Sequence, residues 1–591
     1  MEETSDAKRR RTEGSPAGFD DVEEEARAEE DVGEEEEPDW DAIEAKRLEE
    51  HERILRTRPT RLTHPILDAP EFRPTREEFL DPIAYLEQIR EEAEAYGIIK
   101  VIPPDGWAPE CGLDWESPKR FATKRQRIDR LQQSQPYDDG RKYTLKEYRR
   151  MANRFMDAWL TREERPVDIG TATDWGELYD DYWNIVDRGA MIGEEIEVEY
   201  GNDVDVHKYW TGFVKPDLKP EQLSVAAAAA APYGSPEYYR RSGWNLNNIA
   251  RWPGGLLKHV TVPIAGVTSP WLYLGMLFST FSWHNEDNYL SSINYHHSGA
   301  PKQWFGVPGA KASAFESVVR RFFRSEKKEV PDVLHHMNTM FSPSKLKALG
   351  VPVYQILQQP GEFVVTYPQA FHGGFSYGFN CGEAVNFAAP HWVEHARLAN
   401  ERYRRIGRLA VMGHDRVMFT LARHVDEMDD VESIAQLRDE IRRLAHEDAI
   451  LRPRLYRDGV KDLRAVVRPP RNDVDVFDKQ ASDYDDKRVC CVCKHTCFSS
   501  AVGCRCSQTR VCCLRHVAYM CRCPPSNKYL IEWEPEERHG AAIRAVEARL
   551  RTLGGALAEK PPIEPPREAL LGAAPRPRPP MNPVSPPIGW K

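Results

Sequence analysis

Short apolar runs separated by glycine and proline fill residues 257–390, a pattern typical of β-strands joined by tight turns. This block predicts an antiparallel barrel or jelly roll. Its longest uncharged run, residues 260–283, has the length of a membrane span, but Pro263, Gly266, Pro270 and Gly275 interrupt it. We therefore predict two buried strands joined by a turn there, and no membrane segment.

Helical periodicity is found on both sides of the β-rich block. Apolar residues recur at helical spacing in residues 81–97, and the apolar run 98–102 that follows is predicted to form a short strand. Residues 145–165 predict one helix, and residues 391–455 predict two or three packed helices. The alanine-rich run 225–231 is interpreted as a loop insertion. Together these patterns indicate a mixed α+β protein.

Charge separates the ends of the chain from its middle. The 591 residues carry a net charge of −12, but residues 1–50 alone hold 21 acidic and 7 basic side chains, so the remainder is nearly neutral. We predict a disordered acidic tail, which includes a basic cluster at residues 8–11 that resembles a nuclear-import signal, and an extended proline-rich tail from about residue 560. The acidic balance argues against a strongly basic nucleic-acid binder.

Cysteines are concentrated in one short segment. Ten of the 12 lie between Cys490 and Cys523, and the charged start of the chain predicts no secretory signal, so metal binding is favoured over disulfides. Eight ligands suit two tetrahedral zinc ions: Cys490, Cys493, Cys504, Cys506, Cys513, His516, Cys521 and Cys523. Cys491, Cys497 and Cys512 are then surplus, with Cys497 the alternative ligand. We expect the zinc to stabilise a segment too short for its own core.

A second candidate metal site lies in the β-rich block. His284 and Glu286 share one face of a strand if that strand is unbroken, and His372 follows a second apolar strand. Two histidines and a carboxylate hold non-haem Fe(II) and leave positions for a 2-oxo acid and O2. The alternative, that these are ordinary polar residues at strand ends, stays open on spacing alone. Lys302 could supply the cation that a second carboxylate of the 2-oxo acid needs.

The wider sequence adds a resemblance. WHNEDNYLSSINYHHSGAPKQWFGVPG and GEFVVTYPQAFHGGFSYGFNCGEAVNFA resemble the catalytic core of JmjC-domain histone lysine demethylases. HPILDAPEFRPTREEFLDPIAYLEQI, with GIIKVIPPDGW, resembles the accompanying JmjN element. The cysteine pattern resembles the C5HC2 finger of the JARID-type subgroup that acts on lysine 4 of histone H3. The resemblance covers most of residues 64–530.

The resemblance implies a role for each matching residue. Iron ligands would be His284, Glu286 and His372, and these would be the catalytic centre. The cosubstrate 2-oxoglutarate would contact Tyr200, Phe281, Ser292, Asn294, Lys302 and Trp304. The methylated lysine would meet Tyr273, Asn202 and Ala384, where aromatic faces and oxygens suit a methylammonium cation.

The chain also departs from the family pattern. Ser376 stands where asparagine is common, Asn202 where alanine is frequent, and residues 294–298 differ from the usual order of residue types. These changes concern selectivity and efficiency, not the iron ligands. His259, His296 and His297 are interpreted as structural or pocket-wall residues.

The resemblance implies a double-stranded β-helix, which is a jelly-roll or cupin-like fold, and an Fe(II)-, O2- and 2-oxoglutarate-dependent demethylase with two structural zinc ions. We expect a nuclear chromatin regulator that acts on the histone H3 tail within nucleosomes or chromatin complexes; direct DNA contact stays open. Alternatives are a demethylase of histone H3 lysine 9 or 36, a protein hydroxylase, and a non-catalytic chromatin scaffold. The ligands of a plant-homeodomain finger are absent from the sequence.

The expected organisation has seven parts. They are an acidic tail at 1–58, JmjN at 59–110, a helical linker at 111–225 that includes the start of the core, the JmjC jelly roll at 226–392, a helical domain at 393–485, the C5HC2 finger at 486–540, and a helix with a proline-rich tail at 541–591.

Overall fold

The structure is a computed structural model that describes residues 66–554, with gaps at 134–135, 162–174, 194, 216, 261–262, 325–337 and 462–487. The acidic tail, its basic cluster and the proline-rich tail that the sequence predicts lie outside the described residues.

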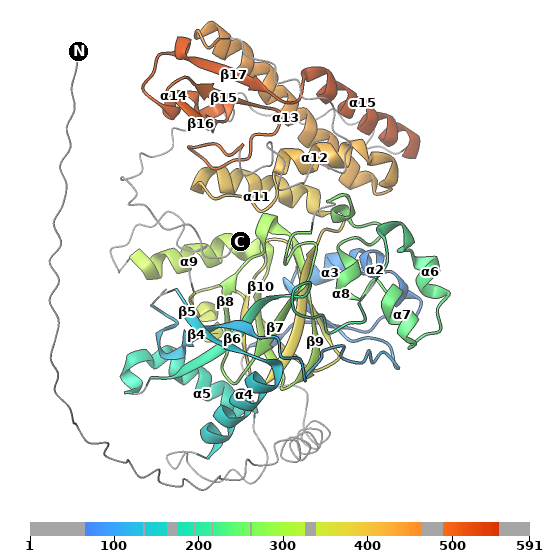
Figure 1. Ribbon diagram of the computed structural model, residues 1–591, viewed down its shortest axis with the longest axis vertical. Helices are drawn as coiled ribbons and strands as arrows, with labels where there is room; N and C mark the ends of the chain where they lie inside the picture. The colour runs from blue at the N-terminus through green and yellow to red at the C-terminus, as the bar shows by residue number, and fades with distance from the viewer. Residues whose placement is uncertain are drawn as a thin grey trace, which may run out of the picture. The chain divides into compact units, whose positions relative to one another are not determined.

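Two sheets form the β-rich part of the molecule (Figure 1). The first has the order β1 (Leu67–Asp68), β11 (Tyr354–Gln358), β10 (Lys302–Val307), β13 (Phe371–Ser376), β8 (Thr280–His284). The second has the order β2 (Glu71–Phe72), β3 (Ile98–Val101), β12 (Phe363–Thr366), β9 (Ser291–Gly299), β14 (Asn380–Phe387), β7 (Trp271–Gly275), β6 (Glu197–Asp205), β4 (Phe121–Arg127), β5 (Asp138–Tyr143).

The central strands of both sheets pair antiparallel, as a jelly roll requires. The predicted mixed α+β fold with a jelly-roll core is therefore confirmed. The run 260–283 does contain two strands joined by a turn, but the first begins only at Trp271. Among the described helices, none combines the length and the hydropathy that crossing a bilayer needs.

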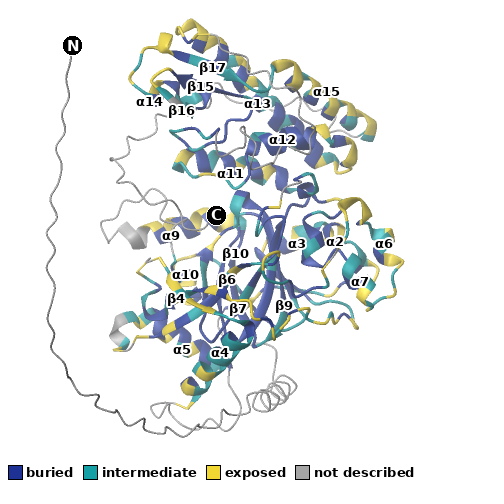
Figure 2. Ribbon diagram, in the orientation of Figure 1, coloured by how far each residue is buried: buried dark blue, intermediate teal, exposed yellow. Residues whose placement is uncertain are grey.

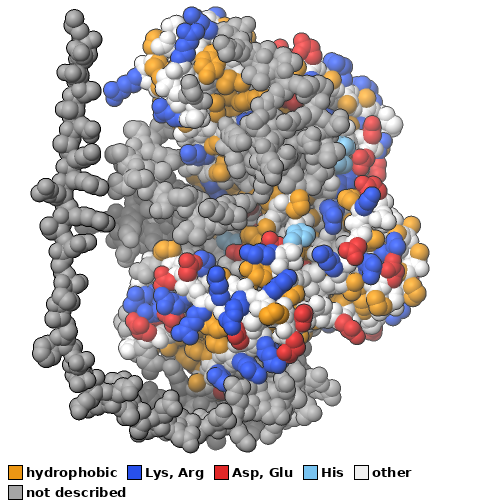
Figure 3. Space-filling view, in the orientation of Figure 1, with side chains coloured by type: hydrophobic (Ala, Val, Ile, Leu, Met, Phe, Trp, Pro, Cys, Tyr) orange, Lys and Arg blue, Asp and Glu red, His pale blue; other side chains and the backbone are white. Residues whose placement is uncertain are grey.

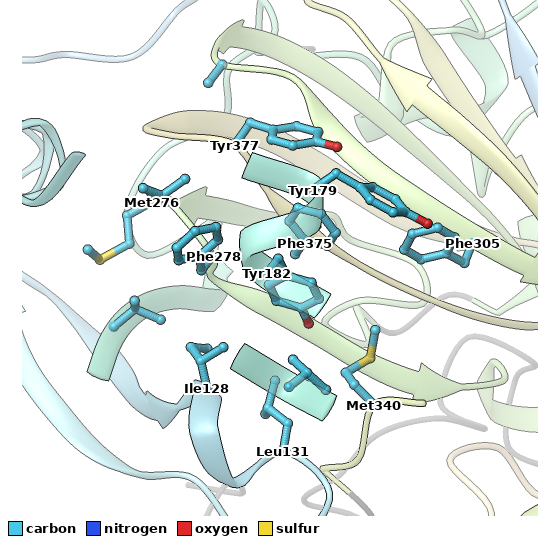
Figure 4. Packing of buried hydrophobic residues seen from close by; sticks show 14 of the residues in the cluster. Ile128, Leu131, Tyr179, Tyr182, Met276, Phe278, Phe305, Met340, Phe375 and Tyr377 are labelled. Carbon is cyan, nitrogen blue, oxygen red and sulfur yellow. The ribbon is translucent and has the colours of Figure 1, made fainter. Parts of the chain in front are cut away.

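Aromatic side chains from one helix pack against the outer face of the first sheet. The helix is α5 (Trp175–Arg188), and its Tyr182 stacks on Phe375 of β13 with ring centroids 3.8 Å apart (Figure 4). The predicted helix at 145–165 is α4 (Leu145–Leu160), which begins with a Thr144–Glu147 capping box. Burial is nearly continuous along the central strands (Figure 2).

Two predictions for local structure need correction. The helix expected over 81–97 is two short helices, α2 (Pro82–Gln88) and α3 (Arg90–Glu94), that meet at Ile89. The alanine-rich run is not a loop, because it forms α6 (Val225–Ala229). Alanine has the highest helix propensity, and the Ser224 hydroxyl accepts a hydrogen bond from the backbone N–H of Ala227.

The other helices are α7 (Pro236–Arg241), α8 (Leu246–Ile249), α9 (Ala312–Arg324) and α10 (Pro343–Ala348) near the sheets, and α11 (Trp392–Ile406), α12 (His414–Arg423) and α13 (Val431–Arg457) after them. The last three confirm the packed helices predicted for 391–455. A three-stranded sheet of β15 (Ser500–Cys504), β16 (Ser507–Cys512) and β17 (Lys528–Glu532) follows, with α14 (Val517–Met520) and α15 (Glu536–Leu553).

Candidate functional site

Three side chains with metal-binding atoms meet at the end of two adjacent strands. His284 is the last residue of β8, His372 lies opposite it on β13, and Glu286 follows in the turn after β8. One ligand atom from each lies within 4.8 Å of the others. His372 Nε2 is 3.3 Å from a Glu286 carboxylate oxygen, and the two imidazole centroids are 4.2 Å apart.

Neighbouring groups orient all three side chains. The Nδ1 atoms of His284 and His372 lie 2.7 and 3.3 Å from the backbone carbonyls of Ser282 and Ala370. A carbonyl can only accept, so each Nδ1 carries the proton and each Nε2 is free to bind a metal. The Asn386 amide donates to the second Glu286 oxygen at 2.8 Å. Sequence reasoning missed Asn386, although it lies in the quoted second motif.

The ionisation states also suit a metal. Desolvation, together with the neighbouring His372, lowers the pKa of His284 to about 4, although the residue is partly open to solvent. Burial opposes ionisation of Glu286, yet its interactions with His372 and His284 and the hydrogen bond from Asn386 outweigh this effect and lower the pKa of Glu286 to about 2. A neutral His284 imidazole and an ionised Glu286 carboxylate are forms that bind a metal.

Strand β8 ends at His284, so the condition under which His284 and Glu286 would share one strand face, an unbroken strand, is not met. A 3₁₀ turn, η6 (Asp287–Tyr289), separates β8 from β9, and Asn288 and Tyr289 both have φ of 52°. Residues other than glycine rarely adopt this left-handed conformation, so the surrounding contacts must hold the turn in place.

Lys302 lies in an aromatic cage near the three ligands. Its ammonium is 4.4 Å from the ring centroid of Phe281, 5.2 Å from Trp304, 5.5 Å from Tyr273 and 5.9 Å from Tyr200. It also donates to the Tyr200 hydroxyl at 3.4 Å. In the described part of the chain, no carboxylate lies within ion-pair distance of Lys302, and burial lowers its pKa to about 7. A buried cation without a counter-ion is suited to an anionic ligand.

The other predicted cosubstrate residues lie on the facing sheet. Ser292 shares a 2.7 Å hydrogen bond with Thr366, and the Asn294 side chain accepts one from Gln358 at 3.2 Å. Gln358 also accepts from the Trp304 indole at 2.8 Å, so it links Asn294 to the cage. Sequence reasoning did not identify Gln358, because a lone glutamine in an apolar strand carries no motif.

The predicted substrate residues lie around β7. Ala384 is half-buried on β14, opposite Trp271 of β7 and Asn294 of β9. Asn202 donates to Asp203 at 2.7 Å, at a bulge in β6 where Asp203 has φ of 56°. The Tyr273 hydroxyl also hydrogen-bonds to Asp203. Asn202, Asp203 and Tyr273 therefore form one polar chain beside Tyr200.

The other singled-out residues have their own surroundings. Ser376 lies opposite Lys302 in the sheet, and its buried hydroxyl has no hydrogen-bond partner among the described residues. His297 contacts the fully buried Glu383 at 3.1 Å, and His296 Nε2 lies 2.8 Å from the carbonyl of Ala300. These contacts fit the structural roles predicted for both histidines.

The cysteines form two clusters of four ligands. Cys490, Cys493, Cys513 and His516 make one, and Cys504, Cys506, Cys521 and Cys523 make the other. Cys497 is buried outside both clusters, with its thiol 3.9 Å from the carbonyl of His495. The division into two sets of four suits two tetrahedral ions.

Helix α11 contacts both regions. On one side the Tyr403 hydroxyl accepts from the backbone N–H of Asn288 at 2.9 Å, and the Trp392 indole donates to the Asn288 carbonyl at 3.0 Å. On the other side Arg404 donates to the Cys513 sulfur at 3.6 Å. The turn that carries Glu286 and the first cysteine cluster therefore rest on the same helix.

The jelly roll places the protein in the cupin-like class, and two histidines and one carboxylate at the end of adjacent strands, next to a caged lysine, are a donor set that suits one metal ion. Three family descriptions match the chain: "JmjC domain, hydroxylase" at residues 271–387, "jmjN domain" at 70–103 and "C5HC2 zinc finger" at 490–538. The chain belongs to the JmjC-domain proteins that also carry a JmjN domain and a C5HC2 finger.

Curated relatives agree with this assignment. JMJ16 of Arabidopsis thaliana is 35% identical over 556 residues, which cover 82% of this chain and 44% of that protein. Lysine-specific demethylase JMJ703 of Oryza sativa subsp. japonica is 34% identical, covering 81% and 41%, and lysine-specific demethylase 5B of Gallus gallus is 35% identical, covering 73% and 26%. The chain thus spans less than half the length of each of these relatives.

Proposed function

We propose that this protein is an Fe(II)- and 2-oxoglutarate-dependent dioxygenase that demethylates lysine 4 of histone H3. The observation that carries the proposal is the pairing of the His284–Glu286–His372 cluster with the caged ammonium of Lys302. The first suits a metal with open positions, and the second suits the distal carboxylate of a 2-oxo diacid. Relatives named lysine-specific demethylases support the same reaction.

Fe(II) fits the donor set, because both imidazoles present unprotonated Nε2 atoms and Glu286 is ionised. Bound there with O2 and 2-oxoglutarate, it supplies the oxidation of an N-methyl group, with release of formaldehyde, succinate and CO2. Asn386 holds Glu286, while Lys302 and Tyr200 orient the cosubstrate. The aromatic rings around Lys302 exclude water, which strengthens its attraction for a carboxylate.

The substrate side of the site suits a methylated ammonium. Tyr273 presents an aromatic ring, and its hydroxyl is fixed by Asp203, whose carboxylate adds negative charge beside the site. The Asn202 amide donates a second hydrogen bond to the Asp203 carboxylate, which reduces the negative charge that this carboxylate presents to the substrate. This arrangement supports a role for Asn202, together with Ala384, in selectivity between methylation states.

The C5HC2 finger favours lysine 4 over lysines 9 and 36, and so do two segments, residues 242–249 and 383–387, that contact each other. Residues 242–249 include Asn247, whose amide donates to Thr211 at 2.9 Å and reaches Glu383 at 3.4 Å, at the start of the segment 383–387.

We further propose that the two cysteine clusters hold structural zinc and that the protein acts on the histone H3 tail in nuclear chromatin complexes. On the face drawn in Figure 3, acidic and basic side chains are interspersed.

Mass spectrometry tests the proposal directly. Histone H3 peptides trimethylated at lysine 4, 9, 27 or 36 are incubated with protein, Fe(II), ascorbate and 2-oxoglutarate. We expect stepwise losses of one methylene mass on the lysine-4 peptide alone. Loss on another peptide would keep the chemistry and overturn the lysine assignment, and a gain of one oxygen would indicate a hydroxylase. No change on any peptide, with iron and 2-oxoglutarate bound, would favour a non-catalytic scaffold.

A further inference from the structure

A second group of two histidines and one carboxylate lies away from the strands that hold the catalytic ligands. His259 ends the 3₁₀ turn η5 (Leu256–His259), His424 caps the C-terminus of α12, and Glu427 ends the turn η9 (Val425–Glu427). One ligand atom from each lies within 4.8 Å of the others. The two imidazole rings stack with centroids 4.4 Å apart and planes 21° apart.

One side chain of the cluster has a nitrogen atom that the described residues leave unpaired. His259 Nε2 is buried and has no hydrogen-bond partner among the described residues. Buried polar atoms in native proteins nearly always have one, so an unpaired imidazole nitrogen calls for an explanation.

The carboxylate is already held in position. One Glu427 oxygen accepts from the Lys258 ammonium at 2.8 Å, and the other lies 3.3 Å from His424 Nδ1. A carboxylate has about four lone pairs, so an ion can share it with the lysine. His424 is 32% exposed and Glu427 53% exposed, which leaves water access to complete the coordination of an ion.

The three side chains come from two parts of the fold, the turn η5 and the segment after α12, so an ion bound by them would connect these parts. The turn η5 is fixed to the end of β14, because the N–H of Leu256 donates to the Ala388 carbonyl at 2.8 Å. His424 and Glu427 belong to the segment that follows α12. Leu257 and Val260 share one apolar cluster with Val425. A shared ion would therefore join the edge of the jelly roll to the helices.

We propose that His259, His424 and Glu427 form an additional binding site for a divalent transition-metal ion of the zinc class. Two imidazole nitrogens and one carboxylate oxygen are donors that suit Zn(II), Co(II) or Ni(II) better than Mg(II) or Ca(II). The site departs from the structural role predicted for His259 from the sequence. It does not depend on the proposed demethylase activity.

Cobalt titration of the full chain tests the site. The background is His284→Ala, which leaves only two of the three donors at the catalytic site, with the cysteine clusters loaded with zinc beforehand. We expect this protein to bind one Co(II), with a visible spectrum that lacks the intense thiolate charge-transfer band. Adding His424→Ala or Glu427→Gln should abolish that one equivalent, and both changes are at partly exposed positions.

The matched control is His446→Ala in the same background, an exposed histidine on α13 outside the cluster. It should keep the Co(II) equivalent. Zinc should also raise the thermal midpoint of the His284→Ala protein and of the His446 control, but not that of the His424 variant. Equal Co(II) binding by the His424 and His446 variants, or no equivalent in the His284→Ala background, would overturn the proposal.

Discussion

The candidate metal site of the jelly roll and the cysteine-rich segment hold their metal-binding side chains in different ways. In the jelly roll, strands β8 and β13 are packed into a large aromatic core, and hydrogen bonds orient each ligand. The apolar cluster around the cysteine-rich segment has fifteen buried residues, and six of them are cysteines. The first site is built by the fold before any metal binds, whereas the second has little core without its ions.

The largest effect should come from breaking a cysteine cluster. Cys493→Ser removes one of four ligands from the first cluster, and the binding free energy of a structural zinc, about 10–16 kcal/mol, is largely folding free energy of such a module. We expect the loss of one of the two zinc ions that the cysteine clusters hold, and faster hydrogen exchange across residues 488–533. Elemental analysis and exchange mass spectrometry measure both. Cys491→Ser, outside both clusters, is the control, and equal zinc content in the two variants would contradict the assignment.

Breaking the jelly-roll site should affect activity without affecting the fold. His284→Ala should lower formaldehyde release at least roughly 10³-fold, equivalent to about 4 kcal/mol, because a metal ligand is lost. Zinc content and thermal midpoint should stay at the values of the unmodified protein, because the core carries the fold. Formaldehyde and zinc assays on this variant and on His446→Ala test the contrast. Comparable turnover in the His284 variant would refute the iron assignment.

Lys302→Met tests the cage. The change keeps the volume and removes the charge, and a charge-assisted hydrogen bond contributes about 1.5–3 kcal/mol. We expect the KM for 2-oxoglutarate to rise roughly 10- to 100-fold, with a smaller change in kcat. Lys345→Met, which removes a half-exposed ion pair with Asp187, should leave KM unchanged. A fall in kcat at constant KM would instead place Lys302 in the chemical step.

The lowered pKa of Lys302 predicts the pH dependence of cosubstrate binding. Burial lowers its pKa to about 7, and a dicarboxylate binds the protonated form. Affinity for 2-oxoglutarate should therefore be full below pH 7 and fall by up to about tenfold per pH unit above it. Without cosubstrate, the free energy of unfolding changes with pH in the opposite direction. Between pH 7 and 10.5 the unfolded chain keeps this proton and the folded protein has lost it, so the free energy of unfolding rises with pH. Calorimetry from pH 6 to 9 measures the affinity for 2-oxoglutarate. If the affinity of the unmodified protein changed with pH in the same way as that of Lys302→Met, this prediction would be wrong.

Much of the fold could be predicted from the sequence because its signals are local. Alternating apolar runs with glycine turns indicated the strands, and periodicity indicated α11, α12 and α13. The failures have physical causes. The alanine run lacks polar periodicity, yet alanine propensity and the Ser224 cap make it helical. The break after β8 depends on left-handed residues Asn288 and Tyr289, which sequence patterns do not indicate.

In the candidate site too, residues that belong to a local motif could be predicted, and residues that act between distant strands could not. His284, Glu286, His372 and Lys302 are carried by recognisable motifs, and the structure places the three ligands together and Lys302 in its cage. The groups that orient them, Asn386 and Gln358, act across strands distant in sequence. Their roles depend on which strands pair, so spacing along the chain could not reveal them.

The smallest predicted effect tests whether α11 supports the catalytic turn or only the cysteine cluster. Tyr403→Phe removes the hydroxyl that accepts from the Asn288 N–H, two residues after Glu286. The loss of one buried hydrogen bond costs about 1 kcal/mol, which is roughly fivefold in an equilibrium constant. We expect the Fe(II) concentration for half-maximal formaldehyde release to rise by about that factor, because the left-handed turn that positions Glu286 is less well held.

The matched control is Tyr519→Phe, an exposed tyrosine on α14 that should change neither metal response. Zinc content should be unaffected in both variants, because the hydrogen bond from Arg404 to Cys513 on the other side of α11 is left intact. If Tyr403→Phe lowered zinc content and left the Fe(II) response unchanged, α11 would serve the cysteine cluster alone. The catalytic turn would then be held by Trp392 and by the ion pair of Arg408 with Asp287, which stay intact in this variant.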